Sequence, residues 1–162
     1  MKATYTSQTI SVEHVKISSK RSFAEVRRRL EETLPKLDVS IADALRSGDQ
    51  KGAKEFDENG PKLSIFEQRD HGSLLQIFGG RRNALQYEIG NPLTSSKMNR
   101  YKLAAVLYTP LRVVLFEDER GNAVFEYDKP SSFCGQFDDE RVTKVGRDLD
   151  LELEAALREA AD

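Results

Sequence analysis

The sequence predicts a single α+β domain, with a roughly five-stranded mixed or antiparallel sheet and helices packed mainly on one face. The length of 162 residues suits one domain with one sizeable core. Short runs with alternating apolar residues are interspersed with longer runs in which apolar residues recur every three or four positions, which is typical of strands and helices respectively. No internal repeat, low-complexity tract or linker divides the chain, so we expect residues 1–162 to form one domain.

The composition excludes several classes of protein and site. The chain has 25 Lys and Arg against 27 Asp and Glu, so it lacks the basic surplus of a DNA-coating protein. A single cysteine, Cys134, excludes an intramolecular disulfide framework and a cysteine-based metal site, and two histidines offer little for another metal. We see no targeting segment and no apolar stretch near the ~20 residues of a membrane span. We therefore expect a cytoplasmic protein with no cofactor and no nucleic-acid or membrane partner, and the unpaired thiol agrees with that location.

The N-terminal third predicts a strand, a helix and a helical insert. The Thr/Ser/Val-rich run from Ile10 to Ile17 favours a strand, with a change of alternation that a bulge or an edge position would explain. The segment Ser22–Glu25 has the spacing of a capping box, so we expect a helix to begin there and to end before Pro35. Residues 38–60 read as an insert of two short helices separated by Gly48.

The middle of the chain alternates short strands with helical segments. We expect a strand over 63–67, a helical turn capped by Asp70 and terminated by Gly79-Gly80, and a half-buried strand over 85–89. Helix-forming residues then run from about Ser95 to Tyr108, and the sequence predicts one continuous helix there.

The C-terminal third predicts a hairpin and a long helix. The segment Leu111–Phe116 is apolar on both faces except at Arg112, which is typical of a central strand. A turn containing Gly121 leads into a second alternating strand that ends near Tyr127. The final helix has an acidic N-terminal end, a weak point at Gly146, and a core stripe made of Val142, Val145, Leu149, Leu153 and Leu157.

Several of these segments together resemble one known family, the domain of unknown function 302 family. The resemblance rests on a Gly-Asn-Pro break after a strand, a Pro-Leu-Arg entry to a central strand and an acidic hairpin ending near Tyr, in the segments Tyr87–Leu93, Leu107–Val113 and Phe125–Asp128. The helix at Phe23 and the Asp70-His71 segment also fit, so the similarity covers about residues 10 to 160. The resemblance implies an α/β sandwich that is often a dimer, and it supplies neither an established activity nor catalytic residues.

His71 is the candidate for acid–base chemistry. A histidine titrates near neutral pH, and the adjacent Asp70 could orient its ring. The simpler interpretation is that Asp70 caps a helical turn and that His71 is an exposed residue of its first turn.

Two further segments are candidates for binding an anion. The segment Gly90–Ser96 joins a strand end to a helix start, where free backbone N–H groups and hydroxyls attract anions, but it also reads as a strand break and cap. Arg112 interrupts an apolar strand, so its charge requires either a carboxylate such as Glu88, Glu126 or Asp128, or an anionic ligand.

The loop Tyr127–Phe137 and the arginine clusters have competing interpretations. Aromatic and polar residues alternate in the loop, which suits a pocket wall, a dimer contact or a packed connector over the last helix. The clusters Arg27–Arg29 and Arg81-Arg82 could contact nucleic acid, but Glu31 and Glu32 favour a solvated helix face for the first.

The sequence thus favours a small-molecule- or partner-binding domain, homodimeric with C2 symmetry, over an enzyme. The alternative is an enzyme that uses His71 as general acid or base on a small anionic substrate. We expect the polar ends of Asp70–Gly72, Gly90–Ser96 and the segment after Tyr127 to converge at one sheet edge. The predicted ligand-binding residues are Asn91, Ser95, Arg112, Tyr127, Asp128 and Ser131, with His71 as the catalytic candidate and no metal ligand.

Overall fold

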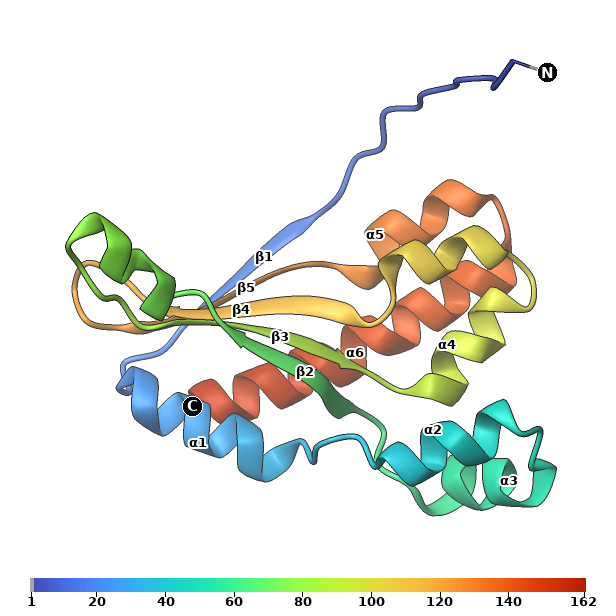
Figure 1. The fold of residues 1–162 in the computed structure, drawn as a ribbon, viewed down its shortest axis with the longest axis horizontal. Helices are drawn as coiled ribbons and strands as arrows, with labels where there is room; N and C mark the ends of the chain where they lie inside the picture. The colour runs from blue at the N-terminus through green and yellow to red at the C-terminus, as the bar shows by residue number, and fades with distance from the viewer. Residues whose placement is uncertain (1) are drawn as a thin grey trace.

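A computed structural model describes residues 2–162 and shows one five-stranded sheet with helices packed on one face (Figure 1). Three 3₁₀ turns, η1 to η3, lie among the regular elements. In chain order the elements are β1 (His14–Ser18), α1 (Phe23–Thr33), α2 (Val39–Arg46), α3 (Gln50–Asn59), β2 (Ser64–Asp70), η1 (Ser73–Phe78), β3 (Ala84–Gly90), α4 (Pro92–Asn99), η2 (Leu103–Tyr108), β4 (Leu111–Glu117), β5 (Ala123–Asp128), α5 (Pro130–Cys134), η3 (Gly135–Phe137) and α6 (Glu140–Ala161).

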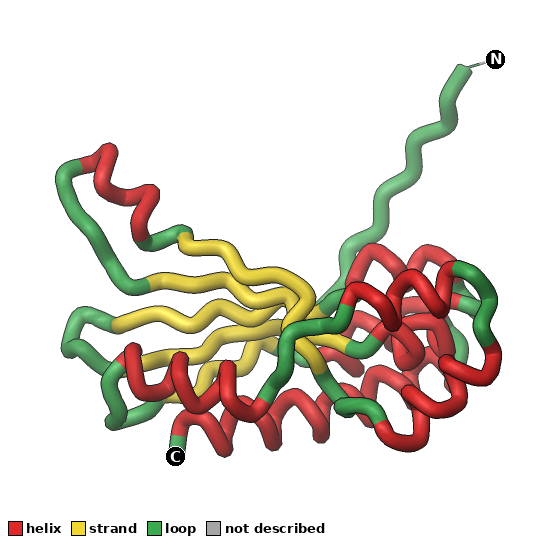
Figure 2. The backbone as a smooth tube through the Cα atoms, turned by 60° about the horizontal axis from the view of Figure 1, so that its bottom comes forward, coloured by secondary structure: helices red, strands yellow, loops and turns green. Residues whose placement is uncertain are grey.

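The sheet has the order β1-β5-β4-β3-β2 and is antiparallel throughout. The apolar segment predicted as a central strand is β4, which lies in the middle of the sheet. Residues on one face align across the strands, as Tyr87 opposite Val113 and Val113 opposite Tyr127 show. Helices α1 and α6 cover that face, and no helix lies over the opposite face of the described chain (Figure 2).

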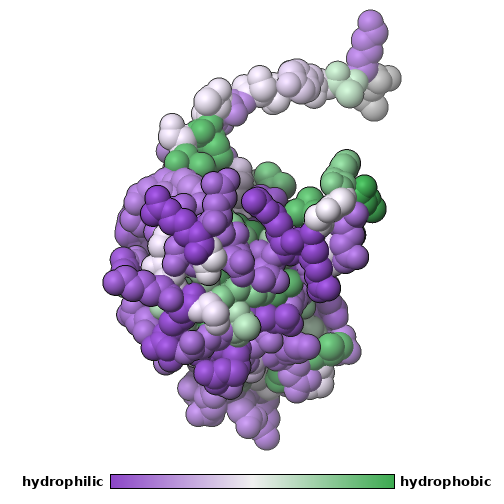
Figure 3. Space-filling model, turned by 90° about the vertical axis from the view of Figure 1, so that its left-hand side faces the viewer, coloured by the Kyte–Doolittle hydropathy of each residue, from purple (hydrophilic) through white to green (hydrophobic). Residues whose placement is uncertain are grey.

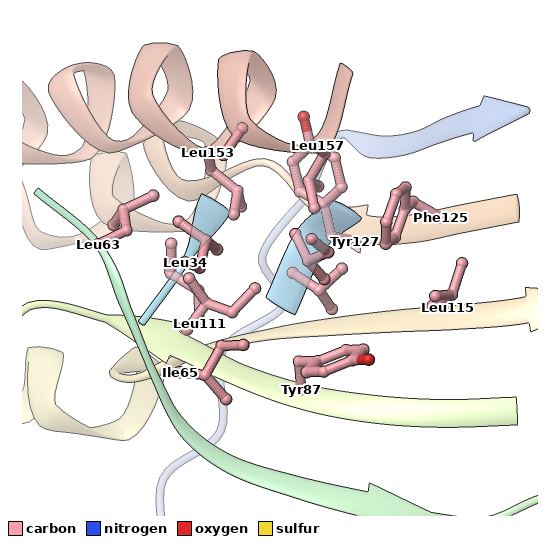
Figure 4. Packing of buried hydrophobic residues seen from close by; sticks show 14 of the residues in the cluster. Leu34, Leu63, Ile65, Tyr87, Leu111, Leu115, Phe125, Tyr127, Leu153 and Leu157 are labelled. Carbon is pink, nitrogen blue, oxygen red and sulfur yellow. The ribbon is translucent and has the colours of Figure 1, made fainter. Parts of the chain in front are cut away.

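The core lies between the sheet and helices α1 and α6. Alternate residues of β3, β4 and β5 point into it and meet leucines of both helices (Figure 4). This arrangement confirms the strand alternation and the helix stripes expected from the sequence. The largest side chains with under 2% exposure include Tyr87, Phe125, Leu30, Ile89, Met98, Leu115, Leu153 and Leu157.

The N-terminal elements follow the prediction with two differences. The first strand is shorter than expected, because Ile10 and Val12 precede β1. Ser22 caps α1 by accepting a hydrogen bond from Glu25 N at 3.2 Å, but the Glu25 carboxylate pairs with Arg21 instead of returning to Ser22. The capping box is therefore half formed.

The single helix predicted over 95–108 is wrong. Helix α4 begins at Pro92 and ends at Asn99, and the chain resumes as the 3₁₀ turn η2. Met98 and Ala105 are buried, whereas Leu103 and Leu107 are exposed. The apolar residues between 95 and 108 include several that form an exposed patch. Their helical spacing therefore did not indicate a single helix with one face against the core.

The aromatic loop before the last helix is a packed connector. It forms α5 and η3, and Phe133 and Cys134 are buried against the core. The Phe133 ring stacks on Tyr108 with a centroid distance of 4.8 Å. Gly146 of α6 lies directly against this connector, since an added Cβ would meet the Cys134 Cβ at 2.9 Å. The glycine that weakens the helix is therefore required for this contact.

Candidate binding groove

Helix α1 presents two Arg–Glu pairs beside its buried stripe, one half-buried on the flank next to the sheet and one exposed to solvent. Phe23, Val26 and Leu30 are buried, so the helical period directs the charged residues between them towards the helix flank. Arg27 Nε lies 2.9 Å from Glu31 Oε1, and Arg28 Nη1 lies 2.6 Å from Glu32 Oε2; the two pairs are Arg27–Glu31 and Arg28–Glu32. Each pair spans one helical turn, the spacing at which side chains on a helix meet.

The sheet contributes a tyrosine that fixes one of these pairs. Tyr87 of β3 is fully buried, and its hydroxyl donates to Glu31 Oε1 at 3.0 Å. The Gln68 amide donates to the same oxygen at 3.2 Å and accepts from Arg27 Nη2 at 3.2 Å, in the orientation that satisfies both of its ends. Glu31 therefore holds Arg27 through a network anchored in the sheet.

The electrostatics of this network keep its tyrosine protonated and its arginine charged. Burial, and then the Glu31 carboxylate, raise the pKa of Tyr87 well above its usual value, so its phenol remains a donor. The hydrogen bond to Glu31 raises the pKa of Arg27, whose charge is permanent.

A groove of about 660 Å³ opens beside this network, between α1 and the strand ends where β3 begins and β4 ends. The Asn83 amide donates to Glu117 Oε2 at 2.9 Å across the two strands. Among residues 2–162, Glu117 forms no ion pair within 4.0 Å, whereas the four α1 charges pair with one another. The groove therefore presents one uncompensated negative charge. Its lining is Ser22, Phe23, Ala24, Arg27, Arg28, Glu31, Glu32, Asn83 and Glu117.

His71 lies at this end of the sheet but does not line the groove. Its backbone N–H donates to Ala84 O at 3.1 Å, and its side chain is exposed. The adjacent Asp70 accepts from Ser73 N at 2.9 Å, so this carboxylate caps η1, and no hydrogen bond in residues 2–162 orients the imidazole. The structure thus has the predicted cap and lacks an oriented base.

Asn91 and Ser95 lie at the opposite end of the sheet, in the cap of α4. Asn91 Oδ1 accepts from Leu93 N at 2.9 Å and Thr94 N at 3.1 Å, and its Nδ2 donates to Pro61 O. Both ends of the amide are therefore bonded within the chain, and Ser95 N donates to Asn91 O. Asn91 also borders a separate cavity of about 130 Å³.

Arg112 and Asp128 share a cavity of about 70 Å³, which is far below the ~300 Å³ of a typical metabolite site. Arg112 is exposed on the uncovered sheet face, and among residues 2–162 none of the predicted carboxylates, Glu88, Glu126 or Asp128, pairs with it within 4.0 Å. The Asp128 carboxylate instead lies 3.0 Å from His14 Nδ1, and the two form an ion pair when the imidazole is protonated.

Tyr127 lies on the core face of the sheet, and Ser131 lies in α5. Tyr127 is 4% exposed, and burial followed by Glu154 raises its pKa to about 12. Ser131 N donates to Asp150 Oδ1 of α6 at 2.9 Å. The predicted ligand residues therefore occupy two faces of the sheet and separate cavities.

The expected convergence of three segments holds for two of them at most. Strands β2 and β3 are antiparallel neighbours, so Asp70–Gly72 and Gly90–Ser96 follow opposite ends of the pair. The seven residues of β3 separate them by roughly 20 Å at ~3.4 Å per residue. Strands β3 and β5 run in the same direction, which leaves Gly90–Ser96 and the residues after Tyr127 at one end.

The sequence predicted that Arg27 and Glu31 lie on a solvated helix face, with nucleic-acid contact as the alternative for the arginines, and it did not predict the groove. The repeated Arg–Glu spacing of α1 was a visible signal for ion pairs. Nothing in the sequence linked that helix to Asn83 or Glu117, because these residues reach it only through the sheet. Within residues 2–162 no group of three or more His, Cys, Asp or Glu side chains could hold a metal, and no helix has the length and apolarity to cross a membrane.

Comparison with known proteins identifies the same kind of domain. The family model described as "Domain of unknown function DUF302" matches residues 54–160, about two thirds of the chain. A crystal structure of an uncharacterised conserved DUF302 protein from Bacillus stearothermophilus superimposes with a TM-score of 0.66 at 17% identity. The alignment covers 91% of this chain and 97% of that one. A search of curated proteins found no match.

Proposed function

The chain belongs to the DUF302 family, and from this premise we propose that it is a binding module whose groove beside α1 takes a small ligand with a cationic group. The observation that carries the proposal is the carboxylate of Glu117, which has no ion pair among the described residues and lines a groove of about 660 Å³, a volume within the range of metabolite sites. The α1 charges cancel in pairs, so Glu117 sets the sign of the site. This chemistry differs from the anion expected at Arg112.

The groove favours binding over catalysis. The Tyr87–Glu31–Arg27 network is held by hydrogen bonds, which preorganises one wall, and Glu117 is a carboxylate with no histidine, cysteine or serine nucleophile paired to it in the described residues. An enzyme that uses His71 remains the alternative from the sequence, but no contact in the described residues orients its imidazole for that role.

The test is an amide chemical-shift titration with small aliphatic amines and with the matching carboxylates. We expect the amines to shift Asn83, Glu117 and residues 22–32, and Glu117→Gln to weaken the binding about tenfold or more, as loss of a charged hydrogen bond implies. The control is Glu119→Gln, an exposed carboxylate in the neighbouring turn. Equal shifts with carboxylates, or unchanged binding in Glu117→Gln, would reject the proposal.

The module is also proposed to be a homodimer with C2 symmetry, through a different surface from the one that the sequence suggested. The aromatic loop is buried within the chain, but η2 exposes an apolar patch made of Leu103, Val106 and Leu107, here called the η2 patch. An exposed apolar patch that meets the same patch of a second copy forms the isologous contact that C2 symmetry requires.

Light scattering at micromolar concentration tests this assembly. We expect twice the 18.3 kDa mass of the chain, and a return to the monomer mass in Leu103→Ser/Leu107→Ser. The control Val39→Ser/Leu151→Ser removes exposed apolar side chains elsewhere and should remain dimeric. A monomeric wild-type chain would contradict the proposal.

A further inference from the structure

The connection between β2 and β3 is a projecting apolar arm. It comprises residues 71–83, extends beyond the end of the sheet (Figures 1 and 2), and contains η1. Leu74, Ile77 and Phe78 are 63%, 81% and 83% exposed, so most of their apolar surface contacts water. Figure 3, which faces this end of the molecule, shows hydrophobic side chains standing out from a largely hydrophilic surface.

The arm is basic although the chain as a whole is acidic. Residues 71–83 contain Arg81 and Arg82 and no Asp or Glu, whereas the net charge of the chain is −2. Both arginines are exposed, and neither forms an ion pair within 4.0 Å among residues 2–162. Apolar tips beside unpaired cations are the two features that together hold peripheral proteins at an anionic membrane surface.

The base of the arm is firmly attached to the sheet. His71 N and Gly72 N both donate to Ala84 O, at 3.1 and 3.0 Å, and Asp70 caps η1. The backbone passes so close at Gly72 that an added Cβ would meet Arg82 O at 1.9 Å. The exposed residues are therefore presented by a fixed support and not by a free loop.

We propose that the arm docks on an anionic lipid surface, with Leu74, Ile77 and Phe78 among the headgroups and upper acyl chains and with Arg81 and Arg82 on the lipid phosphates. The sequence led us to expect no membrane partner because it holds no spanning segment. Docking of an arm at the surface requires only the exposed tip and its charges.

Charge complementarity favours lipid over a second copy of this chain. Another exposed apolar surface of the described chain, the η2 patch, is flanked by Arg100 and Lys102, and the nearby Asp139 carboxylate is already paired with Arg141 at 2.7 Å. The arm has no carboxylate to meet those cations, so docking one on the other would bring like charges together. A layer of anionic headgroups offers opposite charge to both arginines of the arm.

Vesicle co-flotation of the full chain tests the proposal. We expect binding to vesicles of phosphatidylcholine with phosphatidylserine, weaker binding to phosphatidylcholine alone, and loss of binding in Leu74→Ser/Phe78→Ser. Val39→Ser/Leu151→Ser is the matched control, because it also removes two exposed apolar side chains, but from α2 and α6 and not from the arm. This control should bind vesicles as the wild type does.

A second pair of variants isolates the charge. Arg81→Gln/Arg82→Gln should reduce the partition coefficient, by about fivefold for each arginine at low salt, and the reduction should vanish in high salt. Arg46→Gln/Arg120→Gln changes the net charge equally from exposed positions outside the arm and should have little effect.

Three results would overturn the proposal. The first is that the wild-type chain does not float with the vesicles. The second is that the arm variants and their controls lose the same amount of vesicle binding. The third is that the wild type does not bind vesicles while an arm variant changes the oligomeric mass. The last result would indicate that the arm contacts a second copy of this chain and not lipid. None of the substituted arm residues, Leu74, Phe78, Arg81 and Arg82, lines the groove, so amine binding there fails or succeeds independently.

Discussion

The phenol oxygen of Tyr87 on β3 lies 3.0 Å from the Glu31 carboxylate oxygen on α1, and this hydrogen bond joins the buried face of the sheet to the wall of the groove. The two residues are 56 positions apart in the sequence. Because Glu31 also holds Arg27 at 2.9 Å, one buried tyrosine positions both charges. The groove wall therefore depends on a contact that only the packing of α1 against β3 creates.

Replacement of Tyr87 by Phe should lower the free energy of unfolding by about 1–2 kcal/mol, since the hydrogen bond is lost while the ring remains. Partial exposure of Glu31 to solvent keeps the cost at the lower end of that range. Urea unfolding followed by circular dichroism measures the change. Tyr127→Phe is the control, because its hydroxyl forms no hydrogen bond within residues 2–162 and its removal should cost less. Equal losses in both variants would show that the Glu31 contact contributes nothing.

His14 should titrate with its pKa above the ordinary value. Its Nδ1 lies 3.0 Å from Asp128 Oδ1 and its Nε2 lies 3.3 Å from Glu126 Oε2, and these hydrogen bonds, Asp128 first, raise the pKa. The charged ring then stabilises the pairing of β1 with β5 below about pH 6.5, and the contribution is lost as pH rises through the raised pKa. Proton NMR of the His14 ring checks this. Asp128→Asn should lower the pKa, Asp118→Asn should not, and an unchanged value in Asp128→Asn would contradict the assignment.

Gly146→Ala should destabilise the protein, although alanine is the better helix former by about 1 kcal/mol. The new Cβ would meet the Cys134 Cβ at 2.9 Å and the Ser131 Cα at 3.0 Å, and overpacking of this kind costs about 1–3 kcal/mol. Thermal and urea unfolding measure the balance. Gly135→Ala is the matched control, since its Cβ would meet nothing within 4 Å and its φ of −60° suits alanine. A stabilised Gly146→Ala would mean that α5 moves away from α6 without cost.

Arg112→Ala should change the free energy of unfolding by less than about 0.5 kcal/mol, as expected for an exposed side chain without a partner. The sequence suggested a buried ion pair, whose loss would cost about 3–5 kcal/mol. Urea unfolding distinguishes these magnitudes. Arg27→Ala serves as the comparison, because that guanidinium is held by Glu31 and should cost more. A loss of several kcal/mol at Arg112 would indicate a carboxylate partner.

Most of the fold could be predicted from the sequence, because the patterns that indicate strands and helices lie within short segments. The alternation of Leu85, Tyr87 and Ile89 reflects a strand with one buried face, and the stripe of α6 reflects a helix lying on that face. Glycine and proline marked most element boundaries. The helix predicted over 95–108 failed because Leu103 and Leu107 supply helical periodicity but find no core to pack against, so the chain leaves α4 after Asn99.

The sequence by itself determined the elements, the buried stripes and the family resemblance, since each depends on spacing within a short segment. The tertiary structure alone decided which polar residues meet. Antiparallel pairing of β2 with β3 sends His71 and Asn91 to opposite ends of the sheet, and the pairing of β3 with β4 brings Asn83 beside Glu117 under α1. Strand order and direction follow from the packing of the whole chain, so no local pattern could place the groove or expose the arm.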